Sequence, residues 1–515
     1  MATHLRIRRP DTGRSGTGRS GTGRPGIGRG RSATAFATAV LLSGSLAAGA
    51  SAGAPATGET VTGEWVVGDG ADVGVAKWRG GAVKGSGVSG GGFAGAKLSA
   101  RLKALAQAET QELSTSKQSA RLGLPADGPG SLLRADDGSV LVYVRVADTD
   151  RATIQAIEQA GARLTHSAAP HGVVTALVAP SRLDDLASAS GVRSVREALS
   201  PIVGNGEFNG RITPGSSAAT GDGGSVNAAT CAPTVSEGDA QLRADLARSG
   251  LGVDGKGVKV GIISDSFDVD SAAPTHAAAD VAAGDLPGPG NPCGRLAPVS
   301  VLADSGVGGT DEGRAMAQIV HDLAPGASLL FAAAPMGIFE FADNVRALAA
   351  AGSNVIVDDI SYLDEPFFQD GPVSVAIDEV AAAGVSYFTS AGNSNVVSDG
   401  RNVGSFQSPS LRPGACPSFD PGFGVPTLCH DFDPGVGVDP GWDFTVAPGG
   451  GVLLDFQWNE SWYGVSNDID VYVLDSATNE ILGGSIDDNL ISQEPFEVAF
   501  YLNDLPTPRN VKIVV

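Results

Sequence analysis

Between residues 238 and 396, short apolar runs alternate with segments of helical periodicity. The runs are Val258 to Ile263, Val299 to Leu302, Ser328 to Ala333, Val355 to Val357 and Val385 to Thr389. Helices are expected near residues 238–249, 312–322, 340–351 and 372–383. A strand that is apolar throughout is buried on both faces, and such strands separated by helices form parallel sheets. The sequence therefore predicts an α/β unit built on a parallel sheet.

Two further patterns flank this unit. Residues 139–200 read as strand, helix, strand, strand, helix, strand, with Asp150 and Ser181 as helix caps, which predicts a small α+β plait, although other small domains share this pattern. From residue 441 the apolar residues recur with a period of two, which predicts a β-sandwich-like module over 441–515. Residues 97–121 are mostly helix formers with polar faces, so an exposed helix is expected there. Residues 203–236 are rich in Gly, Ser, Thr and Asn and are expected to be a linker.

The N-terminal residues carry an export pattern. Residues 1–52 contain eight Arg and one acid, followed by an apolar run from Ala33 to Ala48 and the small residues Ala50-Ser51-Ala52. A basic region, an apolar region and a small-residue cleavage site are typical of a secretory signal peptide. The alternative, a basic arm for nucleic acid, leaves the apolar run unexplained. We expect a secreted, extracellular protein with no membrane span.

Charge argues against a nucleic-acid partner. The chain has a formal net charge of −22, although its first 52 residues are basic, so the remaining body is strongly acidic and would repel phosphate. Four cysteines in an exported chain predict two disulfides, and of the three pairings we favour Cys416 with Cys429 and Cys231 with Cys293. Zinc is the alternative, but no C-x-x-C pair supports it.

Polar residues follow two of the expected strands and open one of the expected helices. Asp265 comes directly after the strand ending at Ile263, Glu312 opens the helix after Gly309-Thr310-Asp311, and Asn393 follows the strand ending near Thr389. Functional groups of parallel α/β sheets lie just beyond the carboxyl ends of the strands. These three residues are the candidate site.

The same stretches resemble the subtilisin-like serine protease family. Gly255 to Ser266 resembles the strand that ends at the family's catalytic Asp. Leu323 to Ala327 resembles the turn that follows the family's catalytic-His helix, and Ser390 to Ser394 resembles its oxyanion-hole segment. The resemblance covers roughly residues 238–396. It implies a serine-type endopeptidase acting on protein or peptide substrates, with Asp265 as the catalytic Asp and Asn393 as the oxyanion donor. The plait then resembles the family's inhibitory propeptide, as in a zymogen.

The sequence patterns and the resemblance together define the expected domains. They are a signal peptide (1–52), a propeptide-like region (53–202), a linker (203–236), a partial catalytic domain (237–440) and a β-sandwich-like insertion (441–515). No cofactor is implied. Asp468 and Asp470 could bind calcium, but no loop of spaced acids supports this. The sequence does not indicate an oligomeric state.

Two departures from the family matter. Glu312 stands where the family has its catalytic His, and the related sedolisins use a Glu as the general base, so Glu312 is the expected base. A carboxyl pair of Glu312 and Asp265 would share a proton and suit acidic conditions. No Gly-Thr-Ser segment follows Asn393, and the chain ends within a strand-like segment, so we expect the nucleophilic Ser to lie beyond Val515. The alternative is a non-catalytic exported binding protein on a degenerate protease scaffold.

Plainer interpretations stay open for each residue. Asp265 could cap a turn, with Asp268 as the rival carboxylate, Glu312 could be an ordinary acid of a first helical turn, and Asn393 could be a turn residue. His321, nine residues after Glu312, would point to the other side of a regular helix and is expected to be structural. His276 is a minor candidate for the base.

Overall fold

The structure is a computed structural model that describes residues 63–67, 76–80, 97–203, 234–305, 309–334, 337–393, 397–398, 400–421 and 428–515. The expected signal peptide and most of the expected linker lie outside these residues. The chain divides into two compact units, residues 1–91 and 92–515. The first unit contains two described strands, β1 (Gly63–Val67) and β2 (Ala76–Gly80), which pair antiparallel.

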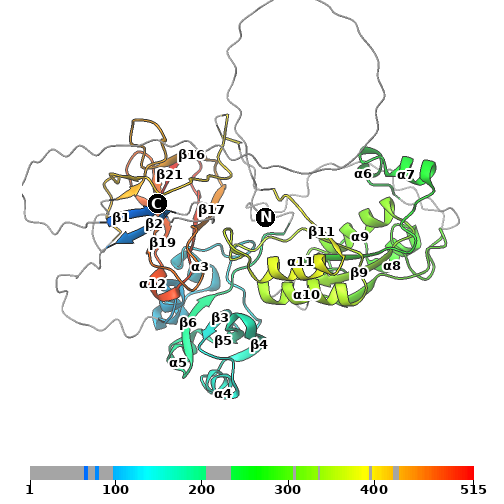
Figure 1. The fold of residues 1–515 in the computed structure, drawn as a ribbon, viewed down its shortest axis with the longest axis horizontal. Coiled ribbons are helices and arrows are strands. Elements are labelled where there is room, and N and C mark those ends of the chain that lie inside the picture. The colour runs from blue at the N-terminus through cyan, green and yellow to red at the C-terminus, as the bar shows by residue number, and fades with distance from the viewer. Residues whose placement is uncertain are drawn as a thin grey trace, which may run out of the picture. The chain divides into compact units, whose positions relative to one another are not determined.

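A five-stranded parallel sheet forms the centre of residues 234–393 (Figure 1). Its strand order is β11–β10–β7–β9–β8, and every neighbouring pair is parallel. The bounds are β7 (Lys259–Ser264), β8 (Ser300–Ala303), β9 (Ser328–Ala333), β10 (Val355–Asp358) and β11 (Ser386–Thr389). The predicted α/β unit with its parallel sheet is confirmed.

Helices cover both faces of this sheet. Along β7, Val260 and Ile262 pack with Phe331 on the side of α8 and α9, while Ile263 packs with the residues of α10 and α11 on the other side. The alternation explains why these strands are apolar throughout, as expected for a doubly covered sheet. The helices of this unit are α6 (Glu237–Gln241), α7 (Ala244–Leu251), α8 (Ala277–Ala283), α9 (Glu312–Leu323), α10 (Ile338–Ala350) and α11 (Pro372–Ala382).

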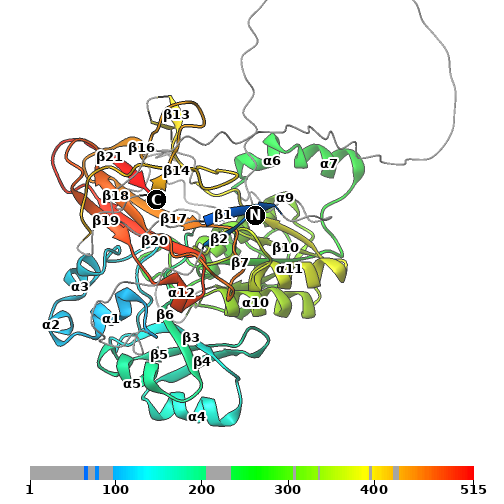
Figure 2. The same cartoon turned by 60° about the vertical axis from the view of Figure 1, so that its left-hand side comes forward.

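Residues 140–197, called the plait from here on, form a four-stranded antiparallel sheet with order β4–β5–β3–β6. The elements are β3 (Val140–Val146), α4 (Arg151–Gln159), β4 (Arg163–Ala168), β5 (Val173–Val178), α5 (Leu183–Ser188) and β6 (Val192–Glu197). Alternate residues of β3 face opposite ways: Val142 and Val144 pack under the helices of the plait, whereas Leu141 and Tyr143 join the core that contains α10. The plait sheet therefore packs on the α10 side of the parallel sheet (Figure 2).

The expectation of an exposed helix over 97–121 is wrong. This stretch forms three short helices, α1 (Ala100–Ala106), α2 (Ala108–Gln111) and α3 (Thr115–Arg121). Leu98, Leu102 and Leu105 are buried in the same core as the plait strands. Because these apolar residues cover the plait, the stretch belongs to its fold rather than to an exposed connection.

Residues 441–515, called the sandwich-like module, contain two antiparallel sheets that share a core. One sheet has the order β16–β21–β18–β19 and the other pairs β17 with β20. Val471 and Val473 of the first sheet lie in one cluster with Ala499 and Tyr501 of the second. The elements are β16 (Trp442–Val446), β17 (Gly451–Gln457), β18 (Val471–Asp475), β19 (Ile481–Ser485), α12 (Asn489–Ser492), β20 (Phe496–Leu502) and β21 (Arg509–Val514).

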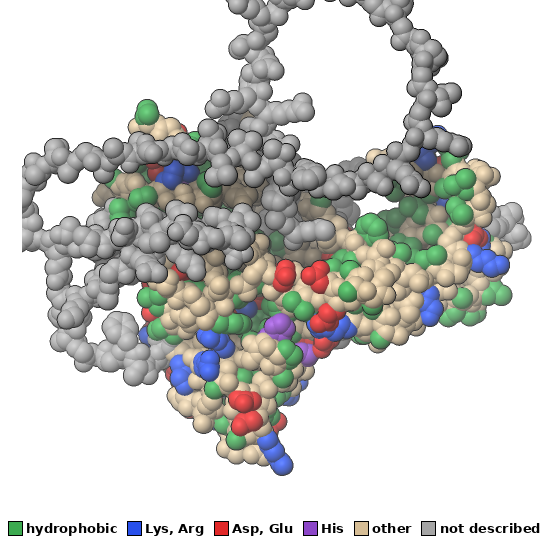
Figure 3. Space-filling view, in the orientation of Figure 1, with side chains coloured by type: hydrophobic (Ala, Val, Ile, Leu, Met, Phe, Trp, Pro, Cys, Tyr) green, Lys and Arg blue, Asp and Glu red, His purple; other side chains and the backbone are tan. Residues whose placement is uncertain are grey.

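The predicted disulfide between Cys416 and Cys429 is present, with 13 residues of sequence separation. The other favoured pair includes Cys231, which lies outside the described residues. Among the described helices, none is long and apolar enough to cross a membrane. On the face that Figure 3 shows, Lys and Arg side chains stand singly or in small groups between acidic ones.

Candidate functional site

Asp265 directly follows β7, the central strand of the parallel sheet, and its carboxylate contacts the start of α9. Its Oδ1 atom accepts a hydrogen bond from the main-chain N–H of Glu312 at 3.0 Å, and Oδ2 accepts from the Thr310 hydroxyl at 2.8 Å and from the Thr310 N–H. The first N–H groups of a helix lack partners within the helix, and the helix dipole favours an anion there. The Asp265 carboxylate therefore satisfies main-chain donors at this helix start and holds Glu312 beside it.

Glu312 is the first residue of α9. Its main-chain N–H donates to Asp265, so the structure brings the two residues together. Its position also fits the plainer interpretation of an acid in a first helical turn.

Close backbone approach places α9 directly beside β7. A Cβ atom added at Gly313 would lie 2.2 Å from a ring carbon of Phe331 and 2.6 Å from the carbonyl oxygen of Ser266. Gly309 has φ +146°, and a Cβ there would lie 2.3 Å from Oγ of Ser266. The absence of side chains at both positions lets the helix begin within hydrogen-bond distance of Asp265.

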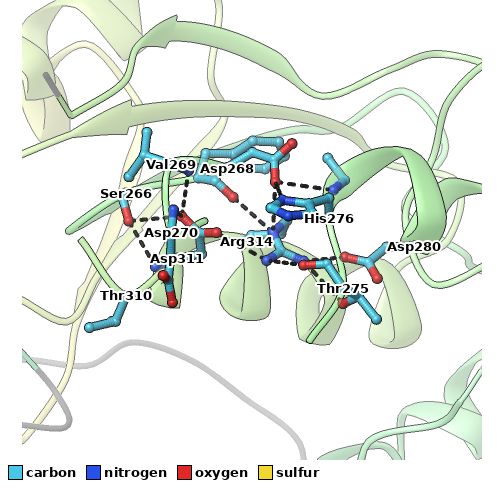
Figure 4. A network of polar contacts seen from close by, with 12 residues as sticks. Ser266, Asp268, Val269, Asp270, Thr275, His276, Asp280, Thr310, Asp311 and Arg314 are labelled. Carbon is cyan, nitrogen blue, oxygen red and sulfur yellow. Dashed lines mark hydrogen bonds and ion pairs between the residues drawn. The ribbon is translucent and has the colours of Figure 1, made fainter. Parts of the chain in front are cut away.

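A buried arginine ties the loop after β7 to α9 (Figure 4). Arg314 is 5% exposed, donates from Nε to the carbonyl of Phe267 at 2.9 Å, and forms ion pairs with Asp280 and, at 3.1 Å, with Asp311. A buried cation needs such partners because water does not reach it. The Arg314 side chain therefore connects the loop after β7 with α8 and α9.

Asp311 completes this connection. Its Oδ1 atom accepts hydrogen bonds from Oγ of Ser266 at 3.1 Å and from the N–H of Val269 at 2.8 Å, and its own N–H donates to Oγ of Ser266 at 2.8 Å. Burial acts to raise the pKa of Asp311, but the hydrogen bonds from Val269 and Asp270 hold it below its usual value. The residue stays ionised and keeps the loop in place.

Sequence reasoning missed a second pair of carboxylates, Asp358 and Asp359, at the end of β10. Asp358 accepts from the Thr389 hydroxyl at 3.0 Å. Burial raises the pKa of Asp359 to about 6; the hydroxyl of Ser264 acts against this rise, and the charges of Asp358 and Asp265 add to it. The signal was present in the sequence, since two acids follow an apolar run whose carboxyl end lies beside that of β7.

The stretch that follows β6 pairs with Ser361, two residues past Asp359. Ile202 and Ser361 exchange both main-chain hydrogen bonds, at 2.7 and 2.8 Å, in an antiparallel bridge. Ile202 belongs to the stretch that follows β6 of the plait. The polypeptide that leaves the plait is therefore joined by one antiparallel bridge to the chain just beyond the carboxyl end of β10.

Asn393 follows β11, two strands away from β7, and is exposed. The parallel topology alone places it at the same edge as Asp265, and the hydrogen bonds that join Asp265 to the start of α9 do not involve it.

Asp268, the alternative catalytic carboxylate, and His276, the minor candidate for the base, lie side by side, and Asp268 is also 3.8 Å from Nε of Arg314 (Figure 4). Oδ1 of Asp268 lies within hydrogen-bond distance of Nδ1 of His276, at 2.9 Å, and both side chains are partly exposed. His321 is 3% exposed, and burial lowers its pKa to about 4. A buried neutral imidazole fits the structural role expected for His321.

The described residues contain no group of three or more His, Cys, Asp or Glu arranged to hold a metal ion. Of the two calcium candidates, Asp468 accepts from the N–H of Asn489 at 3.0 Å, and Asp470 accepts from the Tyr472 hydroxyl at 2.8 Å. Both carboxylates thus have protein donors as partners.

No protein-family model and no curated protein matches the chain. Among solved structures, it is similar to fervidolysin from Fervidobacterium pennivorans, a keratinolytic enzyme related to subtilisin, with 15% identity and a TM-score of 0.24 over 52% of this chain and 43% of that one. It is also similar to the epidermin leader peptide processing serine protease (EpiP) from Staphylococcus aureus, with 10% identity and a TM-score of 0.26 over 49% of this chain and 59% of that one. A mutant of EpiP has 11% identity to this chain and a TM-score of 0.29, over 50% of this chain and 62% of that one. The chain thus matches less than two thirds of each protein, and the likeness is distant.

Gly313→Ala tests the close approach of α9. Alanine normally favours a helix over glycine, but here its methyl group would collide with Phe331 and Ser266, so we expect a loss of about 1–3 kcal/mol in the free energy of unfolding. Gly250→Ala in α7 is the matched control because no atom lies within 4 Å of its added Cβ. Urea unfolding of both variants checks this. Equal stability of the two would contradict the packing described for Gly313.

Asp359→Asn tests the environment of the second carboxylate pair. Because the pKa of Asp359 is about 6 in the folded chain and ordinarily 3.8, the folded state keeps a proton that the unfolded state loses between these two pH values. The stability therefore falls as the pH rises from about 3.8 to about 6 and stays at the lower value above pH 6. After allowance for partial exposure, we expect the variant to be more stable than wild type by about 1 kcal/mol at pH 8 and equally stable at pH 3. Chemical denaturation across this pH range measures the difference. A gap that stays constant with pH would rule out the raised pKa.

Proposed function

We propose that the chain is part of an exported serine-type endopeptidase precursor of the subtilisin/sedolisin type. The observation that supports this best is the start of α9, where the Asp265 carboxylate holds Glu312 at the carboxyl edge of a parallel sheet. Two carboxylates next to an edge that already carries an extended segment suit general base catalysis on a peptide.

In the proposed reaction a serine hydroxyl attacks the peptide carbonyl carbon and Glu312 takes its proton. Asp265 orients Glu312 through the main chain, and Asn393 donates its side-chain N–H to the oxygen on which negative charge develops. The proton on Glu312 then passes to the leaving amine as the carbon–nitrogen bond breaks, which restores the carboxylate and leaves an acyl-serine. Water, deprotonated by Glu312, hydrolyses this ester, and the proton returns to the serine oxygen. Residues 1–515 contain no Gly-Thr-Ser segment after Asn393, so the proposal assigns the nucleophile to a serine outside them.

The proposal treats the plait as an inhibitory propeptide. It packs on α10, and the stretch after it pairs with Ser361 through both main-chain hydrogen bonds. Main-chain pairing of an extended segment with a strand edge is a common mode of peptide binding, and it would keep a substrate from the same edge. The disulfide between Cys416 and Cys429 supports an oxidising, extracellular location.

One observation favours a second candidate function. Because the nucleophile motif is absent from the sequence at hand, the same edge could bind peptides without cleaving them, as a non-catalytic exported binding protein. Both functions share the pairing at Ser361 and differ only in the reaction.

Glu312→Gln tests the base. In the full-length gene product, we expect the wild type to cleave itself within residues 204–236 and the variant to do so at least 100-fold more slowly, because an amide cannot accept the proton. Glu237→Gln, an exposed acid in the first turn of α6, is the matched control and should process normally. Intact-mass measurements over time follow the cleavage. Processing of Glu312→Gln at the wild-type rate would remove Glu312 from the mechanism.

Residues 1–515 expressed alone are expected to show no peptide hydrolysis. Activity of this chain that a serine-directed fluorophosphonate abolishes would overturn the assignment of the nucleophile to a serine outside it. A full-length product that also neither cleaves nor labels would support the binding protein.

A further inference from the structure

Arg196 of β6 lies where three parts of the chain meet. Its guanidinium forms an ion pair with Asp364, in the stretch after β10, at 3.0 Å, and another with Glu494 of the sandwich-like module at 2.6 Å. It also stacks over the ring of Tyr143 at 4.5 Å. The side chains of Arg196, Asp364 and Glu494 are 14%, 7% and 8% exposed. Charges this deeply buried depend on their partners, so removing one partner costs far more than at a surface pair.

Arg101 of α1 forms a second connection to the sandwich-like module. Its Nη1 atom pairs with Glu197 of the plait at 3.2 Å, while Nη2 donates to Oγ of Ser485 at 3.2 Å and to the carbonyl of Val498. The N–H of Ala100 also donates to the carboxylate of Asp487 at 2.6 Å. The charged and polar groups of the two sides are thus matched donor to acceptor.

Apolar contacts accompany these pairs. Val498 is 1% exposed and lies in the core cluster of the plait, with Leu453 and Phe496 packed against it. At Gly130 an added Cβ would lie 2.8 Å from a methyl carbon of Leu453, so the Leu453 side chain packs directly on the backbone of Gly130. The sandwich-like module therefore contributes side chains to the plait's own hydrophobic core.

The three parts also enclose a cavity of about 250 Å³. Its lining includes Tyr143 and Arg196 from the plait, Phe339 and Asp364 from the α/β unit, and Tyr463 and Glu494 from the sandwich-like module. A cavity of this size means that packing is incomplete where the three parts meet.

We propose that the sandwich-like module is a second docking surface for the plait, which keeps the plait attached after the connection between plait and α/β unit has been cut. The plait is held on one side by α10, through Leu141 and Tyr143. On the other side it is held by the hydrogen bonds of Arg101 to Ser485 and Val498 and by the ion pair of Arg196 with Glu494. Cleavage of the chain within residues 204–233 removes none of the residues that make these two sets of contacts. Two contact surfaces on one rigid body reinforce each other because the first holds the second at high effective concentration.

The test measures binding rather than hydrolysis, so its outcome is independent of the proposed function. A recognition sequence for a site-specific protease is inserted near residue 218 of the full chain, the chain is cut there, and the dissociation constant of the two fragments is measured by dilution and size-exclusion chromatography. We expect the wild-type fragments to elute together. Glu494→Gln is expected to raise the dissociation constant at least tenfold, since it leaves the buried Arg196 with one carboxylate.

A matched control separates docking from general stability. Glu480→Gln removes a carboxylate of the sandwich-like module that pairs with Arg509 at 2.7 Å, away from the contacts with the plait, and should leave the dissociation constant unchanged. Arg196→Met provides a second variant on the plait side and should also raise the constant at least tenfold. Thermal unfolding of each uncut variant verifies that it folds.

Wild-type dissociation constants in both Glu494→Gln and Arg196→Met would overturn the proposal. An increase in Arg196→Met alone would also overturn it, because Arg196 would then act through Asp364 of the α/β unit and not through the sandwich-like module. Equal increases in Glu480→Gln and Glu494→Gln would show that the effect is loss of module stability and would contradict a specific docking surface.

Discussion

The hydrogen bonds from the start of α9 to the Asp265 carboxylate fix the arrangement of the whole carboxyl edge. They require that a helix begin almost in contact with the central strand, which Gly309 and Gly313 permit. The negative charge of the Asp265 carboxylate is compatible with this position because the helix dipole favours an anion at the start of α9. Arg314 then ties the loop that carries Asp265 to the helix that carries Glu312, so the two candidate residues cannot move apart independently.

This edge also receives the polypeptide that leaves the plait. The main-chain hydrogen bonds between Ile202 and Ser361 lie two residues from Asp359, whose pKa burial raises to about 6. Peptide binding and acid–base groups thus occupy one small region. The central claim of the proposed function is that this region is a peptide-binding edge, occupied by a segment of the same chain.

The sequence predicted the parallel sheet well because apolar strands between helices leave few other arrangements. It placed Asp265 after a strand and Glu312 at a helix start, and the structure joins the two through the main-chain N–H of Glu312, while their catalytic roles stay predictions. Asp359 was not predicted because the two acids after β10 belong to none of the motifs that carry the family resemblance. The stretch 97–121 was misjudged because Leu98, Leu102 and Leu105 are spaced among polar residues, and only the tertiary contact with the plait shows that they are buried. Arg196 could not be recognised from sequence, as its partners lie 168 and 298 positions away, at Asp364 and Glu494.

Amide hydrogen exchange at Ser361 tests the peptide-binding edge most directly. Its N–H donates to the carbonyl of Ile202 at 2.8 Å, so exchange should be slow in the intact chain and at least 100-fold faster once the plait has been cut free and removed. The N–H of Ile356, buried in β10, should exchange at the same slow rate in both states. Equal exchange of Ser361 with and without the plait would contradict the account.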